Sequence, residues 1–212
     1  MGEKDIAHVD VNELDSEKTV VVATGNPHKV TEIEAILAPV LPGTRFVALG
    51  ELGDFEDPVE DGDTFEANAL IKARAALAEV GLDSVADDSG LVVDALGGAP
   101  GILSARWAGT HGDDAANNEK LLGELADVAD AWRTARFHST VALVRRDGTV
   151  LVGNGDCEGT IARDLRGEHG FGYDPLFCPA ETPGLRMAEL DPERKNEISH
   201  RYHALVDLAA KL

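Results

Sequence analysis

The stretch that decides the fold is TVVVATGNPHK, which runs from Thr19 to Lys29. Its first six residues form a β-branched, apolar run that is typical of a buried strand, and Gly25-Asn26-Pro27 ends that run. Pro27 suits the first turn of a helix, and apolar residues then recur at helical spacing as far as Val40, before Pro42-Gly43 ends the pattern. The sequence therefore predicts a strand, a tight turn and a helix at the start of the fold.

The rest of the chain mixes predicted helices and strands without strict alternation. Asp63 and Glu66 resemble a capping box that opens an alanine-rich helix ending near Val80. We also expect helices over residues 113–125 and 191–212, short strands on both sides of Asp87-Asp88, a hairpin about Asp147-Gly148 with strands over 136–145 and 149–153, and a loop over 170–177 that leads into a strand. This mixture favours an α/β sheet with helices on its faces. No linker or repeat is visible, so we expect a single domain over residues 19–212 and disorder over residues 1–18.

Charge and composition exclude several classes of partner. The 212 residues include 39 acidic and 19 basic side chains, and the net charge of -20 repels a nucleic acid backbone or an anionic membrane. A small anionic substrate needs local cations and a divalent metal to reverse this field. The two cysteines, Cys157 and Cys178, form no metal or disulfide motif, and neither a signal peptide nor a membrane-length apolar run is visible. These features predict a cytoplasmic protein with reduced thiols.

The turn from Thr24 to Lys29 is a candidate phosphate site. It follows a strand and opens a helix, where free backbone N–H groups and the helix dipole attract phosphate, and Lys29 adds a positive charge. The spacing is not that of a Walker A loop. Lys72, on the alanine-rich helix, could bracket a triphosphate together with Lys29. The alternative is a plain turn and two surface lysines.

Asp87-Asp88 is a candidate metal and water site, because the pair lies between apolar, strand-like runs. Charges in such a setting are costly unless they are paired or bound to a metal. One carboxylate that holds Mg²⁺ while activating water is a natural use, and one of the carboxylates over residues 56–63 could complete the metal site. The alternative is a tight turn capped by aspartate and serine.

Two further segments are candidates for binding a base. Gly170-Phe171-Gly172-Tyr173-Asp174 offers an aromatic face for stacking and a carboxylate for a ring N–H, although a packed aromatic turn in the core is equally consistent. Residues 195–201, KNEISHR, gather donors that suit a 6-keto purine, or else form a cationic helix end facing solvent. On one continuous helix, Lys195 and His200 would point about 140° apart. We therefore predict a helix break with Ser199 as the new N-cap.

In this order, five segments resemble the noncanonical purine NTP pyrophosphatase family, also called the inosine triphosphate pyrophosphatase family: ATGNPHK, FEANALIKARAA, ADDSGLVVDALGGAPGILSARWAG, FGYDPLF and KNEISHR. The resemblance covers the chain from about Val20 to Leu212. It implies an elongated, mixed, twisted sheet flanked by helices, two lobes around a central cleft, and a homodimer. It also implies Mg²⁺-dependent hydrolysis of ITP, dITP and XTP to the monophosphate and pyrophosphate, which cleanses the nucleotide pool.

The same resemblance assigns roles to individual residues. It assigns phosphate binding to Thr24, Gly25, Asn26, Pro27, His28 and Lys29, assisted by Lys72. It assigns Mg²⁺ to Glu60 and Asp88, the proton of the attacking Mg²⁺-bound water to Asp88 as general base, a supporting role to Asp87, and substrate contact to Ser89. It assigns the base to Phe171, Gly172, Tyr173 and Asp174, and the 6-keto group to Lys195, His200 and Arg201. Neighbouring carboxylates leave Asp57 and Asp61 as alternatives to Glu60, and no motif ranks ITP, dITP and XTP.

Overall fold

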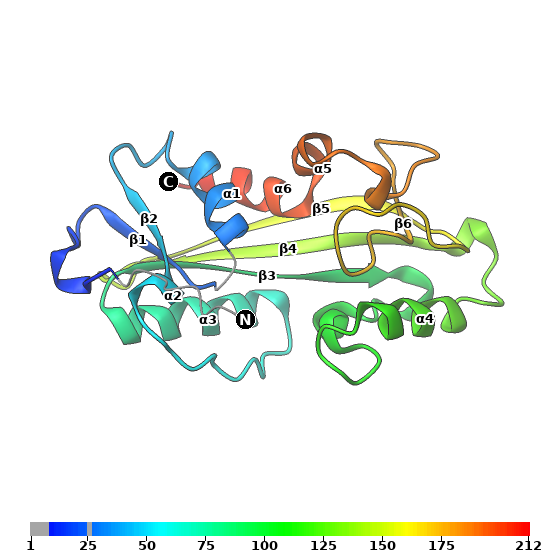
Figure 1. Ribbon diagram of the computed structural model, residues 1–212, viewed down its shortest axis with the longest axis horizontal. Helices are drawn as coiled ribbons and strands as arrows, with labels where there is room; N and C mark the ends of the chain where they lie inside the picture. The colour runs from blue at the N-terminus through cyan, green and yellow to red at the C-terminus, as the bar shows by residue number, and fades with distance from the viewer. Residues whose placement is uncertain (1–8, 25–26) are drawn as a thin grey trace, which may run out of the picture. The chain divides into compact units, whose positions relative to one another are not determined.

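The structure is a computed structural model that describes residues 9–24 and 27–212 (Figure 1). Six strands form one sheet in the order β2-β1-β3-β4-β5-β6. They are β1 (Thr19–Val22), β2 (Arg45–Ala48), β3 (Asp83–Val93), β4 (Thr134–Val144), β5 (Val150–Ile161) and β6 (Phe177–Pro179). β1 pairs in parallel with β2 and β3, whereas β5 and β6 are antiparallel. The predicted α/β class with a mixed sheet is confirmed.

Helices flank this sheet. They are α1 (Pro27–Leu37), α2 (Leu49–Leu52), α3 (Phe65–Val80), α4 (Asp114–Glu124), α5 (Pro192–Ile198) and α6 (His200–Ala209). In the described part of the chain, 3₁₀ turns lie at Val11–Glu13, Asp94–Leu96, Gly101–Arg106, Asp130–Trp132 and Met187–Glu189. α1 and α3 lie on opposite sides of the strands (Figure 1). Within the described residues, no helix is both long and apolar enough to cross a lipid bilayer.

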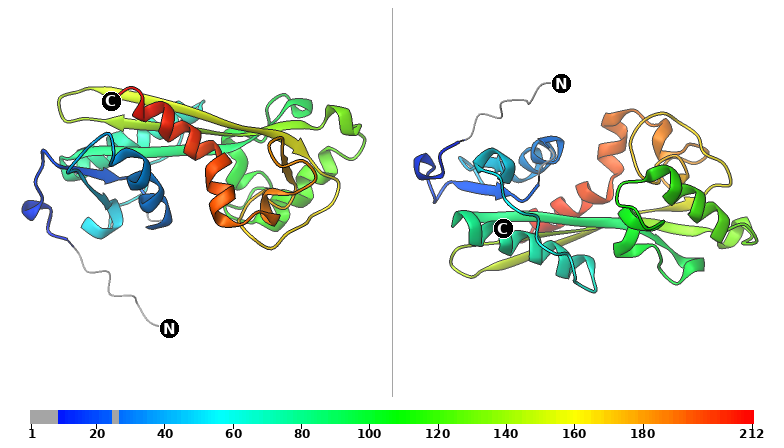
Figure 2. Two further views of the ribbon diagram at one scale, coloured as in Figure 1. Left: turned by 90° about the horizontal axis from the view of Figure 1, so that it is seen from above. Right: turned by 60° about the horizontal axis from the view of Figure 1, so that its bottom comes forward.

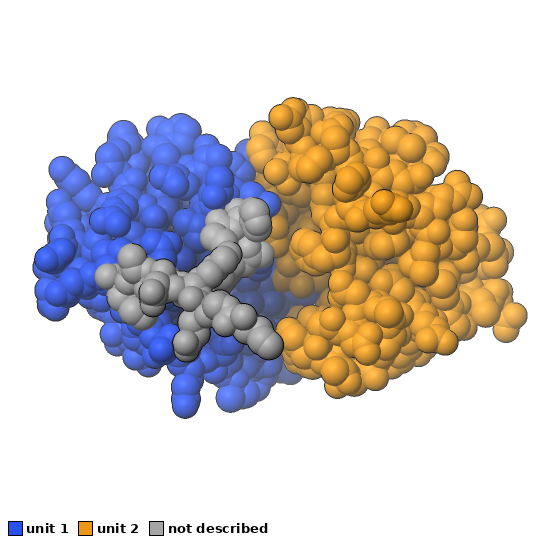
Figure 3. Space-filling view, viewed as in Figure 1, with its two compact units in different colours: residues 1–88, 140–154, 205–212 blue, residues 89–139, 155–204 orange. Residues whose placement is uncertain are grey.

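The chain divides into two compact units, drawn in different colours in Figure 3. Unit 1 contains residues 1–88, 140–154 and 205–212, and unit 2 contains residues 89–139 and 155–204. Neither unit is one continuous stretch, because the chain passes from one to the other several times. A composition shift or linker therefore could not mark the boundary in the sequence, and the single domain over residues 19–212 stays a prediction.

Unit 1 has an apolar cluster that includes the start of the described chain. Val21 and Val47 come from the paired strands β1 and β2, and Val9, Val11 and Leu14 pack against the same cluster. The Val9 N–H donates to the carbonyl oxygen of residue 51 at 2.8 Å. Val9, Val11 and Leu14 thus contact the body of unit 1, where the sequence led us to expect disorder, because these apolar side chains find a core to join. Residues 1–8 lie outside the described part.

Unit 2 has a larger core that combines β3, β4, α4 and the loop before β6. Leu91, Leu121, Phe137 and Phe177 are among its buried residues. Arg133 lies fully inside, where its guanidinium donates to the carbonyl oxygens of residues 125, 161 and 162 at 2.6–2.8 Å. Three satisfied donors make the burial of a charged side chain tolerable, and they tie the end of α4 to β5.

Several local predictions are confirmed. α5 ends at Ile198, α6 begins at His200, and Ser199 Oγ accepts from the Tyr202 N–H at 3.1 Å, so the helix break and its cap are as predicted. α4 begins after Asp113, whose carboxylate accepts from the Ala116 N–H. The hairpin between β4 and β5 turns at residues 145–149, as Figure 2 shows, and β5 continues beyond the predicted residue 153 to Ile161.

Three local predictions are wrong. The N-cap of α3 is Thr64 rather than Asp63, because the Thr64 hydroxyl accepts from the Ala67 N–H at 3.0 Å. The pair Asp87-Asp88 does not sit between two short strands: one strand, β3, runs through it. The helical pattern was expected to continue to Val40, but α1 ends at Leu37 and Val40 is exposed. The helical spacing of Val40 therefore does not mark a buried helix face.

Candidate functional site

Asp87 and Asp88 are successive residues of β3, and successive side chains of a strand point to opposite faces of the sheet. Asp87 is 5% exposed, and its Oδ1 and Oδ2 accept from Lys29 Nζ at 2.9 and 3.1 Å. Lys29 belongs to the first turn of α1, which lies on one side of the sheet. The predicted phosphate turn and the predicted acidic pair are therefore in direct contact within unit 1.

Asp88 meets a different helix. Its Oδ1 accepts from Lys72 Nζ at 2.9 Å, and Lys72 projects from α3, on the other side of the sheet. Lys72 Nζ also lies 3.5 Å from Glu60 Oε1. The ammonium thus joins two carboxylates that come from separate segments of unit 1. Little of the Lys72 and Asp88 side chains is exposed, so each charge depends on the other.

The electrostatics of this group follow from burial and close charges. Burial lowers the pKa of Lys72, but Asp88, Glu60 and Asp87 together outweigh it and raise the pKa above its ordinary value. Burial raises the pKa of Asp88, and Glu60 adds to the rise, whereas Lys72 and Asn68 oppose it. Lys72 therefore stays protonated, while Asp88 holds a proton more readily than an exposed aspartate does.

The donor set fits a hard cation. Among residues 9–24 and 27–212, no three His, Cys, Asp or Glu side chains are grouped as a complete metal site. Glu60 and Asp88 nevertheless converge on one cation, the Lys72 ammonium. Mg²⁺ needs only one or two carboxylates when waters and substrate phosphates supply the other ligands. Two oxygen donors beside the Lys72 ammonium therefore suit Mg²⁺ that arrives with a phosphate ligand.

A pocket of about 240 Å³ in unit 1 adjoins this group. Thr24, Asp57, Glu60 and Lys72 are among the residues that line it, and Asp61 is not. Of the three acidic alternatives, Glu60 is the one that pairs with Lys72 in the described part of the chain. The geometry thus favours Glu60 as the partner of Asp88.

The remaining residues of the predicted phosphate turn are placed only in part. The Thr24 N–H donates to the Val22 carbonyl at 2.8 Å, directly after β1. Gly25 and Asn26 lie outside the described residues, and Pro27 and His28 begin α1. Ser89 follows Asp88 on β3 and is half-buried.

The predicted base-binding residues lie in unit 2. Asp174 Oδ2 accepts from Lys195 Nζ at 2.6 Å and from the Phe171 N–H at 2.9 Å. Lys195 Nζ lies 5.0 Å from the centre of the Phe171 ring, which is 68% exposed and presents an open face. Gly170 has φ 82°, and a Cβ there would collide with the Asp174 carboxylate, so a glycine is needed. An exposed ring, a carboxylate and an ammonium thus form one group.

Tyr173 occupies a different position from its neighbours. Its ring is buried in the core of unit 2, its hydroxyl donates to the Ser104 carbonyl at 2.9 Å, and burial raises the pKa of the phenol. The side chain therefore supports the loop from the core, in agreement with the alternative of a packed aromatic turn. The contact of Tyr173 with a base stays a prediction. Because the ring is buried, backbone atoms of Tyr173 would have to make that contact.

His200 and Arg201 form the first turn of α6. The His200 ring stacks on Phe137, with centroids 5.1 Å apart and planes at 20°, and Arg201 is largely buried. A Cβ at Gly155 would collide with the His200 carbonyl and the Ala204 N–H, so β5 and α6 touch along their backbones. The glycine fixes where the first turn of α6 begins, while Lys195 remains on α5.

Comparison with known proteins identifies the family of this chain. The profile of the Ham1 family matches residues 20–211. The chain belongs to the Ham1 family. It is 51% identical over 193 residues to the dITP/XTP pyrophosphatase of Leifsonia xyli subsp. xyli, covering 91% of this chain and 94% of that protein. It is 50% identical over 194 residues to the dITP/XTP pyrophosphatase of Nocardia farcinica, with the same two coverages.

Two solved structures agree with the fold of this Ham1 chain. The Ham1 protein of Staphylococcus aureus is 40% identical, with a TM-score of 0.81 over 92% of this chain and 97% of that one. A nucleoside-triphosphatase / dITP/XTP pyrophosphatase from Mycobacterium abscessus is 48% identical, with a TM-score of 0.76 and the same coverages. The family resemblance and the sheet architecture expected from the five segments are confirmed.

Some residues that hold the loops of this Ham1 chain are not evident from its sequence. Asn68 contacts Asp88, with 3.4 Å between Nδ2 and Oδ2. In unit 2, the Asp114 carboxylate accepts from the Gly172 N–H at 2.7 Å, and Asn118 Nδ2 donates to the Gly172 carbonyl at 2.7 Å. Asp114 and Asn118 lie one turn apart at the start of α4, a spacing visible in the sequence. Their partner, 54 or more residues away, was not visible.

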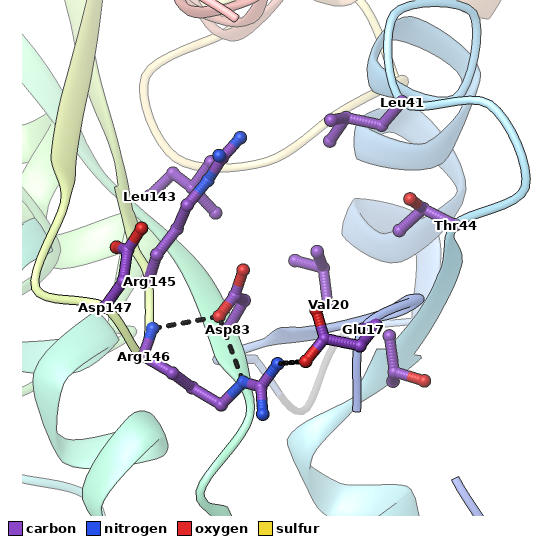
Figure 4. Close-up of a pocket in the computed structure, with 10 residues that line it drawn as sticks. Glu17, Val20, Leu41, Thr44, Asp83, Leu143, Arg145, Arg146 and Asp147 are labelled. Atoms are coloured by element: carbon purple, nitrogen blue, oxygen red, sulfur yellow. Dashed lines mark hydrogen bonds and ion pairs between the residues drawn. The ribbon is translucent and has the colours of Figure 1, made fainter. Parts of the chain in front are cut away.

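Another pocket of this Ham1 chain, of about 530 Å³, contains none of the predicted site residues (Figure 4). Arg146 reaches across it to Glu17 Oε1 at 2.7 Å and to Asp83 Oδ1 at 3.5 Å. The guanidinium thereby links the segment before β1 to the start of β3. Three charged groups of this pocket, Glu17, Asp83 and Arg146, pair with one another, which gives them a structural role in unit 1.

Proposed function

We propose that this protein hydrolyses noncanonical purine nucleoside triphosphates, namely ITP, dITP and XTP, to the monophosphate and pyrophosphate with Mg²⁺. The observation that carries the proposal is the set of three lysine–carboxylate contacts around β3: Lys29 with Asp87, and Lys72 with Asp88 and Glu60. They provide the local cations and oxygen donors that an anionic substrate needs in a protein of net charge -20. The identity of about one half to dITP/XTP pyrophosphatases supports the substrate class.

The two lysines and the start of α1 bind the triphosphate in this proposal. Lys29 and Lys72 supply two charges from opposite sides of β3, and the N–H groups at the start of α1 point toward an anion at the helix terminus. Asp87 holds Lys29 in place. Phosphate oxygens then compete with carboxylates for the two ammonium groups, which frees the oxygens of Glu60 and Asp88 for a cation.

Asp88 accepts the proton of the attacking water. The water oxygen forms a bond to the α phosphorus, the bond from that phosphorus to the bridging oxygen breaks, and pyrophosphate leaves with the bonding electrons. Glu60 and Asp88 would hold Mg²⁺, which supplies positive charge for the phosphates and lowers the pKa of a water bound to it. Asp88 suits the proton transfer because its carboxylate would lie beside the Mg²⁺-bound water once phosphate oxygens take the Lys72 ammonium.

Residues of unit 2 select the base. Phe171 stacks on the purine with its exposed face, and Lys195, His200 and Arg201 donate to the 6-keto oxygen. Adenine carries an amino group at that position and would place donor against donor, which costs far more than a missing apolar contact. ATP is therefore rejected, and ITP and XTP are accepted.

The physiological setting is part of the same proposal. Removal of these nucleotides cleanses the precursor pool in the cytoplasm, with no nucleic acid or membrane partner. The protein acts as a homodimer. The homodimer rests on the family resemblance, and the setting rests on composition together with that resemblance.

A substrate panel tests the proposal. The protein is incubated with ITP, dITP, XTP, ATP and GTP plus Mg²⁺, and pyrophosphate and orthophosphate are measured separately. We expect pyrophosphate from ITP, dITP and XTP, and a loss of about 10²- to 10⁴-fold in kcat for Asp88→Asn. Orthophosphate alone, or equal turnover of ATP and ITP, contradicts the activity. Binding of ITP without turnover identifies a nucleotide sensor, and an Arg201→Ala variant that keeps its preference for ITP contradicts the assignment of the base-reading residues.

A further inference from the structure

We infer that Asn68 is a positioning residue that joins the acidic segment carrying Glu60 to Asp88 on β3, an inference that rests on the proposed function of this site. Asn68 is the fourth residue of α3 and is 1% exposed. Its Oδ1 accepts from the Gly62 N–H at 2.9 Å, and its Nδ2 donates to Asp88 Oδ2 at 3.4 Å. One buried amide therefore contacts both segments that supply the carboxylates.

Gly62 shows how closely the acidic segment approaches α3. A Cβ at this position would lie 2.6 Å from Asn68 Oδ1 and 2.7 Å from Ala67 Cβ. The φ of Gly62 is not in the left-handed region, so close approach explains the glycine. Because Glu60 is two residues before Gly62, this contact places the Glu60 carboxylate near the start of α3.

The geometry at Asp88 completes the link. Asp88 Oδ1 accepts from Lys72 Nζ, and Oδ2 accepts from Asn68 Nδ2. Asn68 and Lys72 are four residues apart, so they project from the same face of α3. The helix thereby holds both oxygens of Asp88, and it contacts the acidic segment at two points, Gly62 and Glu60.

An amide is suited to this position because it provides one donor and one acceptor in a fixed arrangement. An aspartate at 68 would set a second carboxylate against Asp88, and an alanine would leave the Gly62 N–H and Asp88 Oδ2 without these partners. Groups that orient metal ligands in this way typically contribute 10- to 100-fold to metal affinity. A residue that only stabilised α3 would contribute to folding and leave that affinity unchanged.

The test measures Mn²⁺ binding to the full-length protein in a fixed concentration of inorganic phosphate, which takes the place of substrate at the lysines. Binding is measured by the EPR signal of free Mn²⁺ against a protein-free blank, together with amide exchange at Gly62. We expect Asn68→Ala to weaken Mn²⁺ binding by about 10- to 100-fold and to speed exchange of the Gly62 amide. Gly62→Ala should weaken Mn²⁺ binding likewise, because its Cβ pushes the acidic segment away. Two matched controls should keep the parent Kd: Asn117→Ala, which removes a buried asparagine of α4, and Gly123→Ala, which adds a Cβ to open space.

The outcomes separate this inference from the proposed function. An unchanged Kd in Asn68→Ala, or an equal weakening in Asn117→Ala, overturns the positioning role. If Asn68→Ala does not fold, an unchanged Kd in Gly62→Ala overturns it instead. A parent protein that binds Mn²⁺ and releases no pyrophosphate from dITP refutes the proposed function alone, whereas a parent that binds no Mn²⁺ refutes the metal site and the inference together.

Discussion

Replacing Lys72 with methionine isolates the charge that holds the acidic group together. Methionine keeps most of the side-chain volume but removes the ammonium that lies 2.9 Å from Asp88 and 3.5 Å from Glu60. The side chains of Lys72 and Asp88 are only 17% and 12% exposed, so water replaces little of the lost attraction. Breaking a buried pair in this way costs about 3–5 kcal/mol, and the partial exposure favours the lower end, about 3 kcal/mol.

The pH sets a ceiling on this cost. In the Lys72→Met variant, Asp88 can take up a proton, which costs about 1.4 kcal/mol per pH unit above its unfolded pKa near 3.9. The free energy of unfolding that the variant loses cannot exceed the cost of protonating Asp88, which is about 5 kcal/mol at pH 7.5 and about 2 kcal/mol at pH 5.5. The sign follows from Lys72, which lowers the pKa of folded Asp88 against the effect of burial. Without this ammonium the pKa of folded Asp88 rises further, so the variant loses more stability as the pH rises. The deficit of the variant therefore grows with pH.

Urea unfolding of both proteins in EDTA at pH 5.5 and 7.5 measures this deficit. We expect about 3 kcal/mol at pH 7.5 and no more than about 2 kcal/mol at pH 5.5. Lys120→Met is the control, since Lys120 Nζ donates to the Trp107 carbonyl at 2.7 Å and its deficit should not change with pH. A Lys72→Met deficit that is the same at both pH values would falsify the view that Asp88 depends on this ammonium.

Three further predictions test other parts of the structure. Gly155→Ala should lower the free energy of unfolding by about 1–3 kcal/mol, because its Cβ meets backbone atoms of α6, whereas Gly123→Ala on α4 should not; thermal unfolding of both variants decides this. Burial raises the pKa of Cys157 to about 12, so its thiol favours the fold at neutral pH and loses that contribution only as the pH rises from 9 toward 12. A thiol reagent at pH 8 should therefore modify only Cys178 in the folded protein, and both cysteines after unfolding. Phe171→Ala should raise the KM for dITP by about 10-fold with little change in stability, since the ring is exposed; an unchanged KM contradicts base stacking.

The elements that sequence could predict are those whose signals are local. Ser199 caps α6 as expected, because an N-cap depends on a side chain and an N–H three residues ahead. The start of α3 was misplaced by one residue for a related reason: Asp63 and Thr64 are both good caps, and only the backbone geometry selects Thr64. The length of β5 was underestimated, since its glycine- and charge-rich second half does not look like a strand in isolation.

Long-range contacts within the candidate site could not be predicted in the same way. The sequence indicated Lys29, Lys72 and the aspartate pair, but it did not show which lysine meets which aspartate. Asn68 gave no signal, because a buried asparagine on an alanine-rich helix looks like any polar residue until Gly62 and Asp88 are placed beside it. Tyr173 was expected to bind the base together with Phe171. Its ring instead lies in the core of unit 2, a position set by long-range packing that the neighbouring residues in the sequence do not reveal.

The strand through Asp87 and Asp88 explains why two adjacent carboxylates can have separate tasks. In a turn, both could bind one cation, but along β3 they point to opposite faces of the sheet. β1 lies beside β3 with Val22 opposite Val85, so the chain leaving β1 turns into α1 close to Asp87, and Lys29 reaches that carboxylate. Asp88 then faces α3, where Lys72 and Asn68 hold it. The strand order thus lets Asp87 hold Lys29, and in the proposed function it leaves Asp88, with Glu60, to meet both a cation and a water.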